Sequence, residues 1–238
     1  MTNKRIDRNS AGHKGMHTTG MRWPLLALTL IFVGSVTIST GFAGVGVSVK
    51  VGTQGLGGDL TVGLVDKLNI RAGVSGASFD DDYDDDDGNA LSADVNLQVI
   101  PILLDWHPSG GAFRISGGVM INNNEISMTA VPGDTVELND VDYQVDRLDA
   151  EITFDSLAPY VGIGVGNAAN SRSRVNFVFD LGVMYHGSPE FAMSATASNS
   201  ALQSDLDQAV AVEVDEFNED IENYSWYPVL NFGILVRF

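Results

Sequence analysis

Residues 227–238 read Tyr-Pro-Val-Leu-Asn-Phe-Gly-Ile-Leu-Val-Arg-Phe. Side chains of a β-strand alternate between two faces, so every second residue shares a face. One face of this stretch is wholly apolar, while the other carries Asn231 and Arg237. A strand with its apolar row outward and its charge inward is what a β-barrel in lipid requires. The apolar face consists of Pro228, Leu230, Phe232, Ile234, Val236 and Phe238.

Seven further segments show the same alternation, and their connections alternate between short and long. They are residues 45–51, 60–64, 68–75, 91–103, 113–122, 157–165 and 175–185. Outer-membrane barrels keep short turns at the periplasmic end and longer loops outside. The pattern therefore predicts an all-β chain that forms a single transmembrane, antiparallel, up-and-down barrel of about eight strands. The turns at Asp66, His107 and Asn167 are expected to face the periplasm.

Two stretches between these strands are harder to assign. Residues 125–155 are more polar and predict strand extensions plus a loop. Residues 188–224 predict a long loop, in which the spacing of apolar residues in 202–221 indicates a short amphipathic helix. In the fourth strand, the alternation assigns one row to the lipid-facing side: Leu91, Ala93, Val95, Leu97, Val99, Pro101 and Leu103.

The first 43 residues have the pattern of an export signal. Five lysines and arginines precede an apolar run at residues 25–36, and small residues at Gly41 and Ala43 predict cleavage after Ala43. The apolar run is shorter than a membrane-spanning helix needs, although an uncleaved anchor is the alternative. We therefore expect residues 1–43 to be a cleaved signal peptide and residues 44–238 to be the barrel domain.

The charge balance excludes several classes of partner. The leader contains five of the 13 lysines and arginines and one of the 31 acidic residues, so residues 44–238 carry a net charge of −22. This argues against nucleic-acid binding and against a basic patch for anionic lipid. The chain has no cysteine, which excludes disulfides and thiolate metal sites. No cofactor is expected.

The predicted inner faces bring opposite charges together. The expected interior cluster consists of Lys50, Asp59, Arg71, Asp94, Arg114, Asp180 and Arg237. An eight-stranded barrel encloses an interior just wide enough for side chains to fill, and buried charges there must pair. The leading hypothesis is a plugged, non-enzymatic barrel with a structural or surface-interaction role. The alternative is a narrow, porin-like channel for a small solute past the same charges.

An acidic run at residues 80–87 lies in a predicted outward-facing loop. Dense carboxylates suit calcium, and the candidate ligands are Asp82, Asp84, Asp85, Asp86 and Asp87. The spacing does not match the usual calcium loop, because Tyr83 occupies the position of its first acid. The simpler interpretation is a solvated acidic loop.

A catalytic alternative rests on three residues near the end of the seventh strand. His186, Ser188 and Glu190 could act as base, nucleophile and orienting acid of an envelope lipid hydrolase. Such a trio at a loop edge arises easily by chance, so we expect no enzymatic activity. His107, beside Trp106 in a predicted turn, is interpreted as part of an interfacial anchor.

Four stretches together resemble the small outer-membrane β-barrel proteins of Gram-negative bacteria, of the OmpA/OmpW-like size class. They are residues 105–108 (Asp-Trp-His-Pro) with 113–118, 158–164, 181–189 and 227–238. The resemblance implies a location in the outer membrane, among its lipid and lipopolysaccharide. It also implies insertion by the barrel-assembly machinery, which reads a last strand ending in an aromatic residue. That signal corresponds here to Phe232, Ile234, Val236 and Phe238, and no external ligand is implied.

Overall fold

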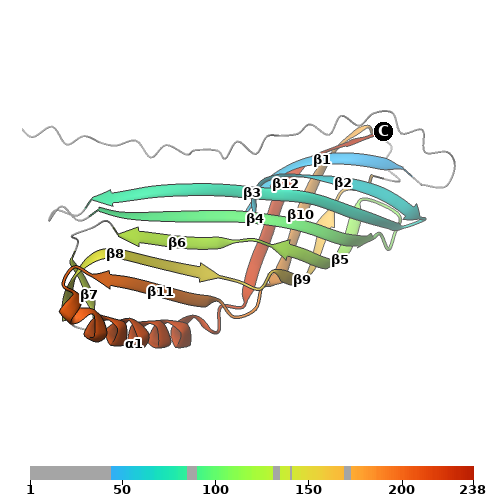
Figure 1. The fold of residues 1–238 in the computed structure, drawn as a ribbon. Coiled ribbons are helices and arrows are strands. Elements are labelled where there is room, and N and C mark those ends of the chain that lie inside the picture. The colour runs from blue at the N-terminus through green and yellow to red at the C-terminus, as the bar shows by residue number, and fades with distance from the viewer. Residues whose placement is uncertain (1–43, 85–89, 131–134, 140, 169–172) are drawn as a thin grey trace, which may run out of the picture.

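The computed structural model describes residues 44–84, 90–130, 135–139, 141–168 and 173–238, and in it eight antiparallel strands close into a barrel (Figure 1). The strands are β1 (Val45–Gly52), β2 (Gly55–Val65), β3 (Leu68–Asp84), β4 (Ala90–Trp106), β5 (Phe113–Asn122), β9 (Leu157–Val165), β10 (Val175–Tyr185) and β12 (Trp226–Arg237). β12 pairs with β1, and β4 pairs with β5, which closes the ring. These are the eight segments predicted from the sequence, so the predicted fold class is confirmed.

The two ends of the barrel differ in their connections. One end, called here the turn end, has the connections at residues 66–67, 107–112 and 166–174. Both ends of the described chain also lie there, since the amide of Phe238 donates to the carbonyl oxygen of Val45 at 2.9 Å. The opposite end, called the extension end, carries the long excursions between β5 and β9 and between β10 and β12. The predicted grouping of the turns near Asp66, His107 and Asn167 at one end is confirmed.

The barrel has the opposite polarity from a water-soluble domain. Large apolar side chains face outward, including Val49, Leu157 and Phe177, the last of which is 83 % exposed. Lys50 and Arg71 face inward, and each is 3 % exposed. Isolated apolar side chains on a surface are ordinary, but a continuous apolar belt around a charged interior is not.

The last strand has the two faces that its sequence predicts. Its outer row is exposed, as Phe232, Ile234 and Val236 show. Its inner row is buried at Val229, Asn231 and Leu235. Phe232 packs against Phe179 of the neighbouring β10, with ring centroids 5.0 Å apart. β12 therefore has a continuous apolar outer face, pairing β10 on one side and β1 on the other.

The predicted orientation of the fourth strand is wrong. Val99, Pro101 and Leu103 are buried inside the barrel, whereas Leu104 and Trp106 are exposed on its outer surface. The clear alternation lies in residues 91–98, outside the part of β4 that pairs with β5, and the prediction extended it into the barrel. The run from Val99 to Leu104 is apolar at every position, so it carries no information of its own about which face is which. The buried charge of Asp105 decides the orientation, because it shares a face with Leu103.

β3 and β4 are each 17 residues long and extend past the barrel into a second sheet. Residues 99–106 of β4 pair with β5, whereas residues 91–96 pair with β6 (Glu125–Ala130). The sheet continues through β8 (Val141–Thr153) to the edge strand β11 (Glu190–Ala197), and β7 (Thr135–Leu138) folds back on β8. We call this sheet, with its helix, the extension. The strand extensions predicted in 125–155 are confirmed, but β11 was not predicted.

One face of the extension is apolar, and a helix covers part of it. The face follows the pairing across the sheet, for example Val95 with Ile126, Ile126 with Ile152, and Ile152 with Phe191. A short 3-10 turn, η1 (Ser200–Leu202), leads into α1 (Gln203–Ile221), which confirms the predicted helix. Within the described ranges, no helix has the length and apolar character needed to cross a membrane.

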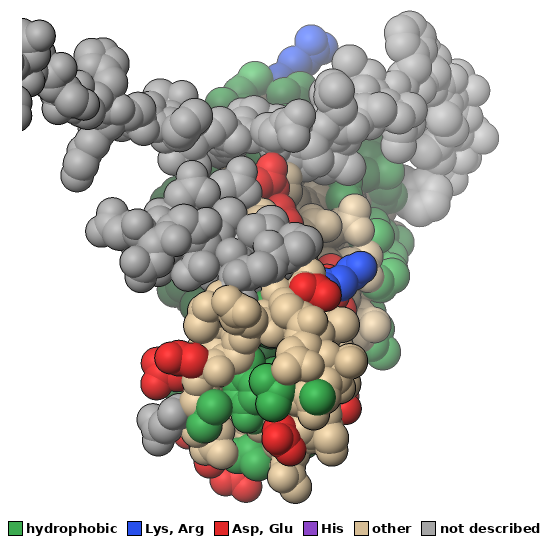
Figure 2. All heavy atoms as spheres, turned by 60° about the vertical axis from the view of Figure 1, so that its left-hand side comes forward, with side chains coloured by type: hydrophobic (Ala, Val, Ile, Leu, Met, Phe, Trp, Pro, Cys, Tyr) green, Lys and Arg blue, Asp and Glu red, His purple; other side chains and the backbone are tan. Residues whose placement is uncertain are grey.

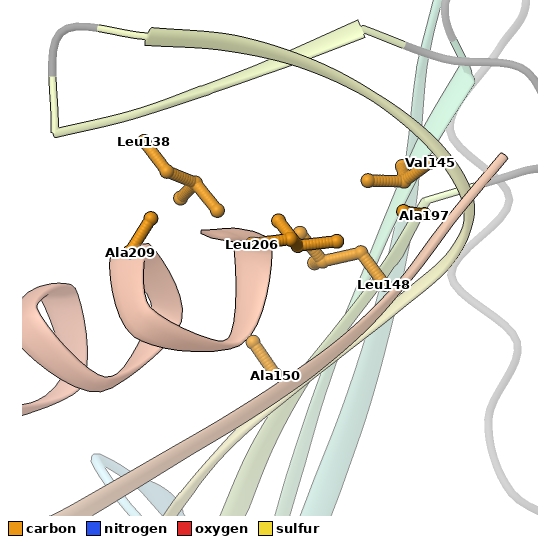
Figure 3. Packing of buried hydrophobic residues seen from close by; sticks show 7 residues of the cluster. All are labelled: Leu138, Val145, Leu148, Ala150, Ala197, Leu206 and Ala209. Carbon is orange, nitrogen blue, oxygen red and sulfur yellow. The ribbon is translucent and has the colours of Figure 1, made fainter. Parts of the chain in front are cut away.

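α1 closes a small hydrophobic core against β7, β8 and β11 (Figure 3). The buried members of this core are Leu138, Val145, Leu148, Ala150, Ala197, Leu206 and Ala209. Amide side chains at two points of the helix hold the edge strand. Gln203 exchanges hydrogen bonds with the backbone of Ala197 and Ala195, and Asn218 does so with Phe191. These bonds satisfy edge groups that would otherwise be open to another strand.

Candidate functional site: the charged interior of the barrel

Six strands contribute one charged side chain each to a buried network inside the barrel. Its members are Lys50 of β1, Asp59 of β2, Arg71 of β3, Asp105 of β4, Arg114 of β5 and Asp180 of β10. Each lies on the inward-facing row of its strand, which is why residues far apart in sequence meet in one layer. We call this set the ionic layer. It contains three cations and three carboxylates, so its formal charge is zero.

Arg71 lies at the centre of the ionic layer. Its Nε and Nη2 donate to the two carboxylate oxygens of Asp105 at 2.9 and 3.0 Å, which is a bidentate pair. Its Nη1 donates to Asp180 at 3.0 Å and to Asp59 at 3.4 Å. Nη2 also reaches the hydroxyl of Ser116 at 3.3 Å. A planar guanidinium with five donors suits this position, because a lysine could not form the bidentate pair.

The other two cations complete the pairing. Lys50 Nζ lies 2.9 Å from Asp59, and Arg114 Nη2 donates to Asp180 at 2.7 Å. Arg114 Nη1 donates to the carbonyl oxygen of Gly166 at 2.8 Å. Burying a charge without a partner is costly, whereas here every charged group faces an opposite charge within hydrogen-bonding distance. The layer is therefore a closed set of ion pairs.

Glycines on β9 and β10 make room for the large interior side chains. A Cβ atom at Gly162 would lie 2.3 Å from the hydroxyl oxygen of Tyr160, and one at Gly164 would lie 3.0 Å from Nε of Arg114. Gly182 would meet the same Tyr160 hydroxyl at 2.5 Å. The bare inner face of this region thus has a physical reason: the strand backbone itself is the wall against which Tyr160 and Arg114 lie.

An apolar layer lies above the ionic layer, toward the extension end. It consists of Val99, Leu103, Met120, Ala158, Tyr160, Met184 and Val229. All seven side chains are buried, and they come from β4, β5, β9, β10 and β12. The barrel interior is thus filled in two successive layers of different chemistry. Interiors of eight-stranded barrels are just wide enough for side chains of this kind to fill.

The turn end of the interior is closed by an amide and imidazole group. His107 Nδ1 lies 3.1 Å from the carbonyl oxygens of both Gly111 and Phe113, so this nitrogen carries the proton. Nε2 then accepts from the side-chain amide of Asn69 at 3.1 Å. His107 is fully buried, whereas its neighbour Trp106 is exposed outside. The prediction that both form an interfacial anchor is therefore wrong for His107, whose inward position fixes the 107–112 turn.

A cavity of about 10 Å³ remains among the ionic-layer residues. One water molecule needs about 10–15 Å³ by the same kind of measure. The oxygens Asp59 Oδ1 and Asn69 Oδ1 belong to residues that line it, and no donor among the described residues reaches them. This cavity has room for about one water molecule.

The structure brings together five of the seven residues predicted for the interior cluster: Lys50, Asp59, Arg71, Arg114 and Asp180. Asp94 instead lies at an exposed position of β4, in the part of that strand that pairs with β6. Arg237 is half-buried at the end of β12. Asp105 was missed, because the strand before it was assigned the wrong outer face. The outward position of Trp106, typical of a barrel rim, was the signal that could have placed Asp105 inward.

The acidic run is not wholly a loop. β3 continues through Asp82 to Asp84, and these residues pair with Ser92 and Ala90 of β4. The other candidate calcium ligands, Asp85, Asp86 and Asp87, lie outside the described residues. Among the residues that the structure does describe, no group of three or more His, Asp or Glu side chains is placed to hold a metal ion.

The three residues of the hydrolase alternative have other contacts. The hydroxyl of Ser188 donates to the backbone carbonyl oxygen of Glu222 at 2.9 Å. His186 is buried beside two aromatic rings. Its ring centroid lies 4.7 Å from that of Phe154 and 6.3 Å from that of Tyr227. Glu190 is an exposed residue at the start of β11. A nucleophile must lie within hydrogen-bond reach of its base, and Ser188 is bonded elsewhere.

Comparison with known proteins gives structural neighbours only. No family model and no curated protein sequence matches the chain. The solved structure of CarO2 from Acinetobacter baumannii matches with a TM-score of 0.53 and 20 % identity, over 84 % of this chain and 100 % of that one. The two chains share a fold. At this identity the likeness shows the barrel architecture and nothing about activity.

Two further solved structures have lower scores. CarO from Acinetobacter baumannii matches with a TM-score of 0.49 and 20 % identity, over 82 % of this chain and 98 % of that one. A major outer membrane protein from Thermus thermophilus matches with a TM-score of 0.41 and 18 % identity, covering 82 % of this chain and 99 % of that one.

Proposed function

We propose that this chain is an integral outer-membrane β-barrel protein with a plugged interior, and that it has a non-enzymatic structural or surface-interaction role. The observation that carries the proposal is the filling of the barrel by the ionic layer and the apolar layer. The cavity among the ionic-layer residues is only about 10 Å³, which supports a filled interior over an open pore.

The membrane location rests on the outer surface of the barrel. The apolar belt is bounded by aromatic residues at both ends, as lipid-facing barrels require. Tyr185 and Trp226 contact each other at the extension end, with ring centroids 5.0 Å apart, and Trp106 and Phe113 are exposed toward the turn end. The export signal expected in residues 1–43 and the fold shared with CarO2 agree with this location. With the turn end toward the periplasm, the extension and its acidic surface project from the cell, beside lipopolysaccharide.

The membrane proposal is tested by gel mobility and extraction. A folded barrel resists sodium dodecyl sulfate, so unheated protein is expected to migrate differently from boiled protein. The protein should also require detergent for extraction from the outer-membrane fraction. Identical migration of the two samples, together with solubility in the absence of detergent, would rule out the proposal.

The plug is tested by conductance in planar lipid bilayers. Purified protein is expected to give no reproducible unit openings, because both layers block the path. The double variant Arg71→Ser with Asp105→Ser keeps the ionic layer neutral while removing its bidentate ion pair. Combining it with Met120→Gly and Met184→Gly removes two large side chains from the apolar layer. Openings in this combined variant but not in the natural chain support the plug. Regular openings of the natural chain would favour the narrow-channel alternative.

The assembly role of the last strand is part of the same proposal. Phe232, Ile234, Val236 and Phe238 form its exposed row, and an exposed aromatic end is available to the barrel-assembly machinery before insertion. Phe238 contributes one backbone hydrogen bond to Val45 and is otherwise largely exposed. Its removal should therefore affect insertion in cells more than stability of the refolded barrel.

A further inference from the structure

The extension contains an apolar groove between its sheet and α1, separate from the barrel interior. Its volume is about 220 Å³. The floor is the apolar face of the sheet, including Met128 of β6, Ile152 of β8 and Met193 of β11, and α1 supplies Phe217 and Glu213 at its side. We propose that this groove binds a cationic amphiphile, meaning a single alkyl chain that carries an ammonium group.

The side of the groove formed by α1 is fixed by hydrogen bonds between the helix and β11. Asn218 bonds to the backbone of Phe191 at 2.8 and 2.9 Å, and Gln203 bonds to Ala197 and Ala195 at 2.9 and 3.0 Å. Phe217 packs on Phe191 with ring centroids 4.5 Å apart. Because both ends of β11 are bonded to the helix, these bonds fix the position of α1 over the sheet. The site is therefore largely formed before a ligand arrives.

The size of the groove selects a chain rather than a bulky ring system. Sites for drug-sized molecules usually occupy about 300–1,000 Å³, which exceeds this groove. Thioether side chains of Met128 and Met193 adapt readily to the outline of a flexible apolar ligand. A narrow apolar floor open along one side therefore fits an unbranched alkyl chain whose polar end remains in water.

The charge around the groove selects a cation. Residues 187–225, which include β11 and α1, contain nine acidic residues and no lysine or arginine. Residues 125–153 contain eight acidic residues and one base, Arg147, which is paired with Asp149. Figure 2 shows hydrophobic side chains flanked by acidic ones at this part of the molecule. Glu213 lies at the groove itself, so an ammonium group beside it is attracted while a carboxylate is repelled.

The test uses methyl NMR of the full chain in nanodiscs of phosphatidylcholine, with labelled methionine. Apart from those in the leader, the chain has four methionines: Met128 and Met193 line the groove, and Met120 and Met184 lie in the apolar layer of the barrel. Titration with decylammonium is expected to shift the two groove methyls and leave the two barrel methyls unchanged. Decanol should bind more weakly, and decanoate more weakly still.

Two pairs of variants separate a specific site from partition into lipid. Met193→Trp fills the groove and should weaken decylammonium binding at least about tenfold. Ser194→Trp, on the opposite face of the same strand, should leave it unchanged. Glu213→Gln should weaken decylammonium binding about twofold to fivefold without affecting decanol, as expected for one partly exposed charge pair. Glu219→Gln, an exposed change on the same helix, serves as its control.

Three results would overturn the inference. Shifts confined to Met120 and Met184 would place the ligand in the barrel. Equal binding of decylammonium and decanoate would remove the charge argument. If Met193→Trp and Ser194→Trp weaken decylammonium binding equally, the binding is partition into lipid and not a specific site. If Met193→Trp fails to fold, judged by gel mobility before and after boiling, Met128→Trp with Thr129→Trp as control tests the same groove from β6.

Discussion

Replacing Arg71 with methionine is expected to destabilise the barrel strongly, because Arg71 is the shared partner of three buried carboxylates. Its guanidinium lies within 2.9–3.4 Å of Asp105, Asp180 and Asp59. Arg71→Met leaves three carboxylates facing only Lys50 and Arg114. Removing one partner of a buried ion pair costs about 3–5 kcal/mol of unfolding free energy, and we expect a loss in that range.

The measurement is urea unfolding of refolded protein in detergent micelles, followed by tryptophan fluorescence and by gel mobility. The matched control is Arg147→Met in the extension, where Arg147 donates to Asp149 at 3.0 Å and the two side chains are 70 % and 39 % exposed. That hydrogen bond lowers the pKa of the Asp149 carboxyl, but water and salt screen the pair. The control should leave the unfolding midpoint of the barrel unchanged.

A double variant distinguishes lost charge balance from lost packing. Arg71→Met with Asp105→Leu restores an ionic layer of two cations and two carboxylates. Buried ion pairs can often be replaced by apolar residues of similar volume without loss of stability. The double variant should therefore recover much of the stability that Arg71→Met loses. If Arg71→Met costs no more than Arg147→Met, or if the double variant is less stable than the single one, the charge-balance explanation is refuted.

Three further predictions concern other parts of the chain. Gly162→Ala should cost about 1–3 kcal/mol, because its Cβ would overlap the hydroxyl of Tyr160, whereas Gly117→Ala, whose nearest neighbour is 3.8 Å away, should be neutral by the same unfolding assay. Deleting Phe238 should lower outer-membrane yield in cells more than it lowers the unfolding midpoint of refolded protein; equal losses would remove its role in assembly. Asn218→Ala should speed amide hydrogen exchange in β11 about tenfold and leave barrel exchange unaltered, and unchanged exchange in β11 would show that the helix does not protect this edge.

The barrel could be predicted from sequence because its signal repeats. Seven of the eight strands alternate between apolar and polar or small residues inside the barrel. The alternation is clear wherever the inner face contains a polar side chain, as with Asn231 in β12 or Arg71 in β3. The signal failed from Val99 to Leu104, where the inner face of β4 contributes to the apolar layer. A barrel interior that is itself partly apolar removes the contrast on which the prediction depends.

The extension was harder to predict because its strands are marked only weakly. β11 reads Glu-Phe-Ala-Met-Ser-Ala-Thr-Ala, where the apolar row ends in small residues and resembles a loop. Its pairing with β8 depends on contacts more than 30 residues away in sequence, which local periodicity does not encode. Most charges of the ionic layer could be predicted from the sequence, but the central position of Arg71 could not. Its contacts with Asp105, Asp180 and Asp59 depend on strand register, which local periodicity does not encode.

In the proposed membrane orientation, the length of β3 and β4 sets how far this protein reaches from the lipid surface. A strand needs about 9–11 residues to cross a bilayer, and at about 3.3 Å per residue the surplus in a 17-residue strand spans about 20–25 Å. β3 and β4 continue without a break from the barrel wall into the extension, so they connect the two parts directly. In the proposed orientation the groove is carried above the lipid headgroups, into the saccharide zone of the cell surface. Shortening both strands by matched residue pairs would lower the groove by about 6–7 Å per pair of residues removed from each strand, without altering the barrel below.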